Sequence, residues 1–299
     1  MSVPRIAVSL AVVALSGAAL SAAAANGCKL EREASLPAHL AADDRLVVDA
    51  RVEGRPVAFL FSPALAYSAL TSATAEQASS PIFEQRRRSA FHDGTKLTRE
   101  TMVSNLDIGN MSYVNQYMPV LESGAVPDGI GGIVGANLLR HDDIEVDLTG
   151  GMVSIYAPSR CGQTPVYWAK DWFELPVRAT GEGDRLIASI TANGKPLQAM
   201  IDFGAGRSVL TPAAAASVLG SSSTTKGDIG SLAIGSITFH AVSVDVRPFA
   251  PADIAPGEAA PAADMLIGMH EFKRLRTYVD YTDGKLAFTL AGNEAAAGR

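Results

Sequence analysis

The sequence contains two copies of one pattern, and this internal repeat is the feature that most constrains its fold. Gly194 lies 140 residues after Gly54, and placing one over the other aligns Gly-Lys-Pro with Gly-Arg-Pro. The same offset superimposes Ser68 on Ser208, Leu70 on Leu210 and Thr71 on Thr211. Two later blocks recur in the same order: Leu106-Asp-Ile-Gly109 with Leu232-Ala-Ile-Gly235, and Ile133-Val-Gly135 with Leu266-Ile-Gly268. Three blocks in one order predict two homologous lobes.

Each lobe consists of short segments with the patterns of β-strands. Residues 46–52 alternate between apolar and polar, and Asn193-Gly194 is a strong signal for a two-residue hairpin. Thr211-Pro212 before an alanine run predicts the start of a short helix, which Gly220 would end. The chain has 299 residues, of which 47% are hydrophobic, so it can build two cores. We expect an all-β protein of two β-barrel-like lobes with short helices.

The ends of the chain differ in composition from the two lobes. Arg5, the apolar residues 6–20 and the small residues 22–25 have the order of a secretory signal peptide. A membrane anchor is the alternative, but an alanine-rich segment is only weakly apolar. The expected organisation is a signal peptide at 1–25, an N-terminal lobe at 26–160 that opens with a polar surface lead-in up to residue 45, a connector at 161–172, a C-terminal lobe at 173–290 and a disordered tail at 291–299. The expected location is therefore periplasmic or secreted.

The only cysteines, Cys28 and Cys161, both follow the predicted signal peptide. In an exported protein, two cysteines suggest one disulfide. Two free thiols are the alternative, and a lipid-modified Cys28, although its flanking sequence fits that processing poorly, would attach the protein to a membrane.

Composition excludes some classes of function. The net charge of −6 argues against a nucleic-acid partner, which would need a basic face. The five histidines are scattered without metal-ligand spacing, so neither a metal nor another cofactor is expected.

The most distinctive single stretch is Met200-Ile-Asp202-Phe-Gly204-Ala205. An apolar strand ends in a carboxylate, and the glycine after it permits a tight turn. Asp202 could accept backbone N–H groups and hold that turn, or it could contact a ligand.

These motifs resemble the aspartic peptidases, specifically the retropepsin-like family in a tandem, bacterial exported form, over residues 46–290. In that family an apolar-apolar-Asp-Thr/Ser-Gly-Ala turn is followed by an apolar-apolar-Gly motif and a short helix. The second lobe matches through Asp202 and Gly268, and the first lobe matches in its later half through Gly135. The resemblance implies two catalytic carboxylates, one from each lobe, that share a proton and activate water.

The sequence departs from that pattern at both turns. Ser62 stands where the first carboxylate belongs, and Pro63 and Ala64 replace the residues that follow it. In the second lobe, Phe203 replaces the Thr or Ser whose hydroxyl cross-links the two turns in the family. Asp202 is thus the only retained dyad position, and a serine cannot act as a carboxylate base.

We therefore expect a non-proteolytic homologue that binds an extended peptide or protein segment in the cleft between the lobes, for example by strand addition. The hairpin tips near Gly94 and Gly227 are candidates for flaps over that cleft. The alternative is an active aspartic endopeptidase in which the second lobes of two chains each supply Asp202. The first lobe already occupies that partner's position, so a monomer is expected rather than a dimer.

Overall fold

The computed structural model describes residues 30–291, except for 91–95, 123, 140–141, 159–165, 181–184, 222 and 249–262. The described residues form the strands β1 Arg32–Leu40, β2 Leu46–Val52, β3 Arg55–Ser62, β4 Ala69–Thr71, β5 Ile82–Ala90, β6 Lys96–Ile108, β7 Met111–Leu121, β8 Gly132–Gly135, β9 Asp143–Asp147 and β10 Met152–Tyr156 in the first half. The second half contains β11 Phe173–Thr180, β12 Arg185–Ala192, β13 Lys195–Ile201, β14 Ser208–Leu210, β15 Lys226–Ile234, β16 Ile237–Val246, β17 Met265–Ile267, β18 Leu275–Asp280 and β19 Lys285–Leu290. The helices are short: α1 Ser72–Gln77, the 3-10 helix η1 Ala136–Leu138, α2 Pro212–Leu219 and α3 Met269–Phe272.

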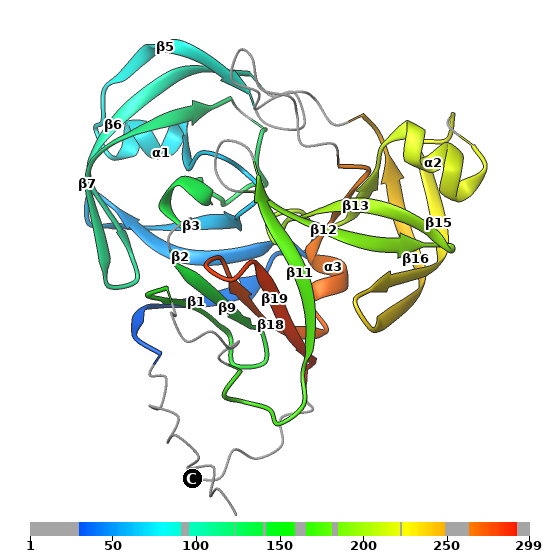
Figure 1. The fold of residues 1–299 in the computed structure, drawn as a ribbon. Coiled ribbons are helices and arrows are strands. Elements are labelled where there is room, and N and C mark those ends of the chain that lie inside the picture. The colour runs from blue at the N-terminus through cyan, green and yellow to red at the C-terminus, as the bar shows by residue number, and fades with distance from the viewer. Residues whose placement is uncertain are drawn as a thin grey trace, which may run out of the picture.

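The two lobes share one topology, as the repeat predicts (Figure 1). In the first lobe β3 runs parallel to β8, and β4 pairs antiparallel with β8 and parallel with β7. In the second lobe β13, β17, β14 and β16 make the same set of pairings. Parallel neighbours cannot be joined by a tight turn, so each lobe must carry its chain around before β8 or β17 returns. This return places an equivalent turn directly after β3 in the first lobe and directly after β13 in the second.

The hairpins that precede these turns are also equivalent. Glu53 and Gly54 join β2 to β3 with φ angles of 49° and 76°, and Asn193 and Gly194 join β12 to β13 with φ angles of 47° and 75°. Two consecutive positive φ angles are the signature of the tight hairpin turn whose twist matches that of the strands. The two hairpins therefore fix β3 and β13 in the same register relative to their partners.

One sheet, to which both halves of the chain contribute strands, joins the lobes and is called the shared sheet below. Its strands follow one another in the order β1-β10-β9-β18-β19-β11, so the first half supplies one side and the second half supplies the other. The halves meet where β9 pairs antiparallel with β18. In Figure 1 these strands lie below and between the two lobes.

The prediction of a polar surface lead-in before residue 46 was wrong. Residues 32–40 form β1, which pairs with both β10 and β2. Its residues Ala34, Leu36 and Ala38 point into the core, with 8% exposure or less. The small side chains of Ala34 and Ala38 and the intervening Pro37 weaken the alternating pattern, and β10, one of the two pairing partners of β1, lies far along the chain.

The predicted helix signals were correct. Thr211 caps α2 by accepting a hydrogen bond from the backbone N–H of Ala214, and Gly220 ends the helix with a φ of 74°. Thr71, the equivalent residue of the first lobe, caps α1 through Thr74.

Several sequence predictions lie outside the described residues: the signal peptide at 1–25, Cys28, Cys161 and Gly94. Gly227 is not a hairpin tip, because it lies within β15 opposite Val244. In the part of the chain that the structure describes, no helix is both long enough and apolar enough to cross a bilayer.

Candidate functional site

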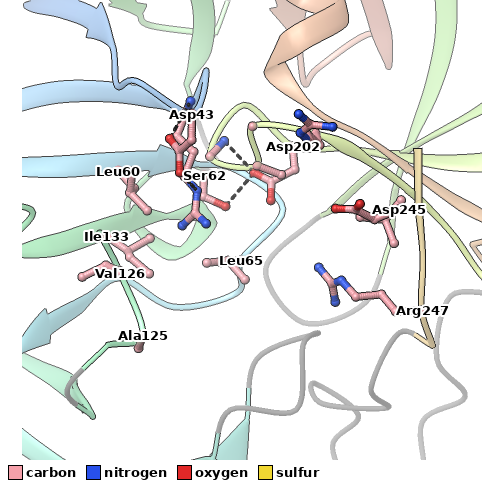
Figure 2. A pocket seen from close by; sticks show the side chains of 16 residues that line it. Asp43, Leu60, Ser62, Leu65, Ala125, Val126, Ile133, Asp202, Asp245 and Arg247 are labelled. Atoms are coloured by element: carbon pink, nitrogen blue, oxygen red, sulfur yellow. Dashed lines mark hydrogen bonds and ion pairs between the residues drawn. The ribbon is translucent and has the colours of Figure 1, made fainter. Parts of the chain in front are cut away.

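The two equivalent turns meet at the centre of the molecule. Ser62, the last residue of β3, donates a hydrogen bond from Oγ to Oδ1 of Asp202, which follows β13, over 2.7 Å. The backbone N–H of Gly204 donates to the same oxygen over 2.8 Å. Ser62 and Asp202 are each only 2% exposed (Figure 2). The residue that faces Asp202 from the first lobe is therefore a hydroxyl donor.

Close packing between the lobes depends on Gly204. A Cβ atom on this residue would lie 2.4 Å from Cβ of Ser62, much closer than two carbon atoms can approach. The equivalent residue of the first lobe, Ala64, does have a side chain, which is fully buried in a small apolar cluster otherwise made of second-lobe residues: Ile187, Met200, Val209 and Leu266. Each turn thus fits into a space that the opposite lobe leaves, and Pro63, also buried, lies between Ser62 and Ala64.

Phe203 turns away from the site. Its ring is fully buried and packs edge-to-face on Phe272 of α3, with 5.4 Å between ring centroids. Its carbonyl oxygen accepts a hydrogen bond from the backbone N–H of Leu46 over 3.0 Å, which links the turn to β2 of the first lobe. The cross-linking hydroxyl that the resemblance implies at this position is thus replaced by an aromatic contact within the core.

The predicted supporting glycines lie directly beneath the turns. A Cβ atom on Gly135 would approach the backbone of Tyr67 to 2.5 Å, and one on Gly268 would approach that of Arg207 to 2.7 Å. Ala205, next to Gly204, accepts a hydrogen bond from the backbone N–H of Met269. Only glycine permits these two crossings, and they hold each turn against the strand that returns beside it.

A buried serine supports each turn, a role that the sequence did not predict. Ser68 accepts a hydrogen bond from the backbone N–H of Gly135 over 2.8 Å, and Ser208 accepts one from Gly268 over 3.0 Å. Ser68 also donates to the side chain of Asn137. These serines superimpose in the internal repeat, which was the signal that could have identified them.

The second lobe contains a buried carboxyl at the corresponding place. Glu271 of α3 accepts a hydrogen bond from Oγ of Ser208 over 2.5 Å and is 3% exposed. Burial raises the pKa of Glu271 above its ordinary value, although the hydrogen bond from Ser208 opposes the shift. Nothing in the local sequence around Glu271 distinguishes it from a surface glutamate.

A loop of the first lobe covers the second turn. The carbonyl oxygen of Asp43 lies so close to Gly206 that a Cβ atom there would be only 1.9 Å away. The next residue, Asp44, forms an ion pair with Lys273 over 2.8 Å and a hydrogen bond with Nδ1 of His270 over 2.6 Å. The hydrogen bond from Lys273 lowers the pKa of Asp44. These contacts fasten the lobes together beside the site.

A cavity of about 250 Å³ opens between the turns and exposes one edge of the Ser62 and Asp202 pair (Figure 2). Apolar residues of the first lobe form one wall: Leu60, Leu65, Ala125, Val126 and Ile133. The opposite wall belongs to the second lobe and includes Arg207, Val209, Asp245 and Arg247. Among the described residues, no three His, Cys, Asp or Glu side chains are grouped closely enough to hold a metal ion.

The chemistry available here is hydrogen bonding rather than proton exchange between two acids. Asp202 accepts from Ser62 and from a backbone N–H, which is the turn-holding role considered for it from the sequence. Acid–base catalysis by an aspartic dyad requires one carboxyl to carry the proton while the other acts as the base. A serine hydroxyl is too weak an acid to take either part at ordinary pH.

Comparison with known proteins supports the fold. The aspartic proteinase from Irpex lacteus is similar to this chain in three dimensions, with a TM-score of 0.53 over 89% of this chain and 99% of that one. Only 13% of the aligned residues are identical. No model of a known protein family matches the sequence, and no curated protein sequence matches it. The similarity therefore concerns shape, and it confirms the all-β, bilobal, aspartic-proteinase-like fold.

Proposed function

We propose that this chain is an exported, non-proteolytic relative of the aspartic peptidases that binds an extended peptide or protein segment in the cavity between its lobes. The observation that carries the proposal is the hydrogen bond from Ser62 to Asp202. It places a hydroxyl donor where the peptidase mechanism needs a second carboxylate. The fold keeps the interlobe cavity, while the pair at its base lacks the shared proton of a dyad.

Packing around the site argues against the alternative, an active dimer with one Asp202 from each chain. Asp202 is almost fully buried, and Ser62 and Ala64 occupy the side that a second chain would have to approach. Opening that side would expose the apolar cluster around Ala64, at a cost of about 25 cal/mol for each Å² of apolar surface. Sedimentation of the purified protein tests this point, and a stable dimer would favour the alternative.

The central experiment is incubation of the purified protein with a diverse peptide library, followed by mass spectrometry. We expect no cleavage by the wild type. Cleavage by the wild type that Asp202→Asn abolishes would overturn the non-proteolytic proposal, because that substitution removes only the carboxylate. A triple variant, Ser62→Asp with Pro63→Thr and Ala64→Gly, restores the family pattern in the first lobe and serves as the matched comparison.

Binding is measured separately, by fluorescence anisotropy of labelled extended peptides. We expect saturable binding that does not require peptide cleavage. A chain that binds none of the peptides, even at millimolar concentration, would contradict the binding half of the proposal.

A further inference from the structure

The two walls of the cavity differ in chemistry. Leu60, Val126 and Ile133 present apolar side chains from the first lobe. Asp245 and Arg247 of the second lobe lie across the cavity from them (Figure 2). A ligand that fills the cavity must therefore offer an apolar group to one side and a polar or charged group to the other.

Strand geometry explains why the charged residues share one wall. β14 runs parallel to β16, with Val209 opposite Asp245. Side chains alternate along a strand, so residues two apart point to the same face. Val209 lies on β14 and Asp245 on β16, while Arg207 directly precedes β14 and Arg247 directly follows β16. All four residues reach the cavity, as their presence in its lining confirms.

Most of these charged groups have no partner among the residues that the structure describes. Arg45, which also lines the cavity, pairs with Asp43 over 3.0 Å. Within the described part of the chain, the guanidinium groups of Arg207 and Arg247 have no hydrogen-bond or ion-pair partner, and neither has the carboxylate of Asp245. The second-lobe lining holds two arginines, Arg207 and Arg247, and two carboxylates, Asp202 and Asp245, so its charges balance. What it offers a ligand is two guanidinium groups that have no partner among the described residues.

We infer that the cavity selects peptide segments in which an apolar residue is directly adjacent to Asp or Glu. This inference rests on the proposed peptide binding and specifies its ligand. Consecutive side chains of an extended peptide point to opposite sides, so one would meet the apolar wall and the next would meet Arg207 and Arg247. A guanidinium binds a carboxylate through two parallel hydrogen bonds, which gives geometric selectivity as well as charge. A cavity of about 250 Å³ has room for this pair of side chains and little more.

The test uses four labelled peptides that share one Ser- and Thr-rich frame and differ at two central positions: Leu-Glu, Leu-Gln, Leu-Lys and Ser-Glu. We expect the Leu-Glu peptide to bind about ten-fold more tightly than the Leu-Gln peptide, as for one charge-assisted contact in a partly desolvated site. Ser-Glu should bind more weakly than Leu-Glu because it leaves the apolar wall uncovered. Added salt should weaken Leu-Glu binding more than Leu-Gln binding.

Variants identify the residues that cause the preference for the Leu-Glu peptide over the Leu-Gln peptide. Arg247→Gln and Arg207→Gln should each reduce the ratio between the Leu-Glu and Leu-Gln affinities, and Arg247→Lys should restore part of it. Arg178→Gln is the matched control, because Arg178 is exposed on β11, bonds to Gln198 and does not line the cavity. Thermal melts establish that each variant is folded.

The outcomes separate the two proposals. Equal binding of Leu-Glu and Leu-Gln, or a ratio that neither arginine substitution changes, would overturn the charge preference while leaving peptide binding intact. A preference for Leu-Lys would show that Asp245 governs the wall and would also overturn it. Binding of no peptide would overturn both the preference and the proposed function.

Discussion

Gly204 faces Ser62 so closely that a single methyl group on the glycine would lie 2.4 Å from Cβ of the serine. This contact joins the turns of the two lobes. Neither turn can shift away from the other easily, because Ser62 is also fixed by its hydrogen bond to Asp202. The interlobe fit therefore depends on the absence of one side chain.

Gly204→Ala should lower the free energy of unfolding by about 1–3 kcal/mol, the usual cost of inserting a methyl group into a filled interior. Urea denaturation measures this change. Gly230→Ala is the control, since Gly230 is an exposed strand residue whose added Cβ would have only Asn193 Oδ1 nearby, at 3.3 Å. Equal stability of the two variants would show that the turns can separate freely.

The bond between Ser62 and Asp202 should be measurable by a double-mutant cycle. Hydrogen bonds to charged groups contribute about 1.5–3 kcal/mol, and a buried acceptor that loses its donor bears the full cost of desolvation. We expect Ser62→Ala to destabilise the protein by about 2 kcal/mol, and the coupling with Asp202→Ala to exceed about 1 kcal/mol. Additive effects of the two substitutions would mean that the bond adds nothing to stability.

The supporting serines should differ in importance. Ser208→Ala leaves both the N–H of Gly268 and the buried Glu271 without their hydroxyl partner. Ser68→Ala leaves the N–H of Gly135, while Asn137 still accepts from the backbone N–H of residue 68. We expect Ser208→Ala to cost at least about 1 kcal/mol more in unfolding free energy than Ser68→Ala, as measured by chemical denaturation. The reverse order would contradict the structural roles assigned to Glu271 and Asn137.

Glu271 should make stability fall as the pH rises. Burial raises the pKa of Glu271 above its ordinary value of 4.5, so between 4.5 and the folded-state pKa the native chain holds a proton that the unfolded chain has released. The unfolding free energy therefore decreases with increasing pH through that interval. Glu271→Gln keeps an acceptor for Ser208 and removes the titration. The unfolding free energy of the variant, relative to that of the wild type, should therefore increase as the pH rises from about 4.5 to 7. A constant difference would show that Glu271 titrates normally.

Much of the fold follows from the sequence because its signals are local or repeated. Asn193-Gly194 specified a hairpin turn, and Thr211-Pro212 specified a helix start, each through the backbone angles or caps that those residues favour. The repeat also aligned Ser62 with Asp202, and the structure places the two residues in contact.

The elements that the sequence did not reveal depend on distant partners. β1 is stabilised by β10, whose residue Tyr156 pairs with Arg32. The contacts of Asp44 with His270 and Lys273 join residues of opposite lobes, and nothing near Asp44 in the sequence predicts them. Likewise, Arg207 and Arg247 share one wall of the cavity only because β14 and β16 lie side by side.

The shared sheet has a consequence for the order of folding. In each half of the chain, the first strand pairs with a strand of the last hairpin. β1 pairs with β10 in the first half, and β11 pairs with β19 in the second. The first half can therefore close on itself before the second half leaves the ribosome. The direct strand pairing between the halves is short, with Thr277, Tyr278 and Val279 opposite Val146, Glu145 and Ile144. Because it needs both closed halves, this seam must form late, and mechanical pulling on the two ends should open it early.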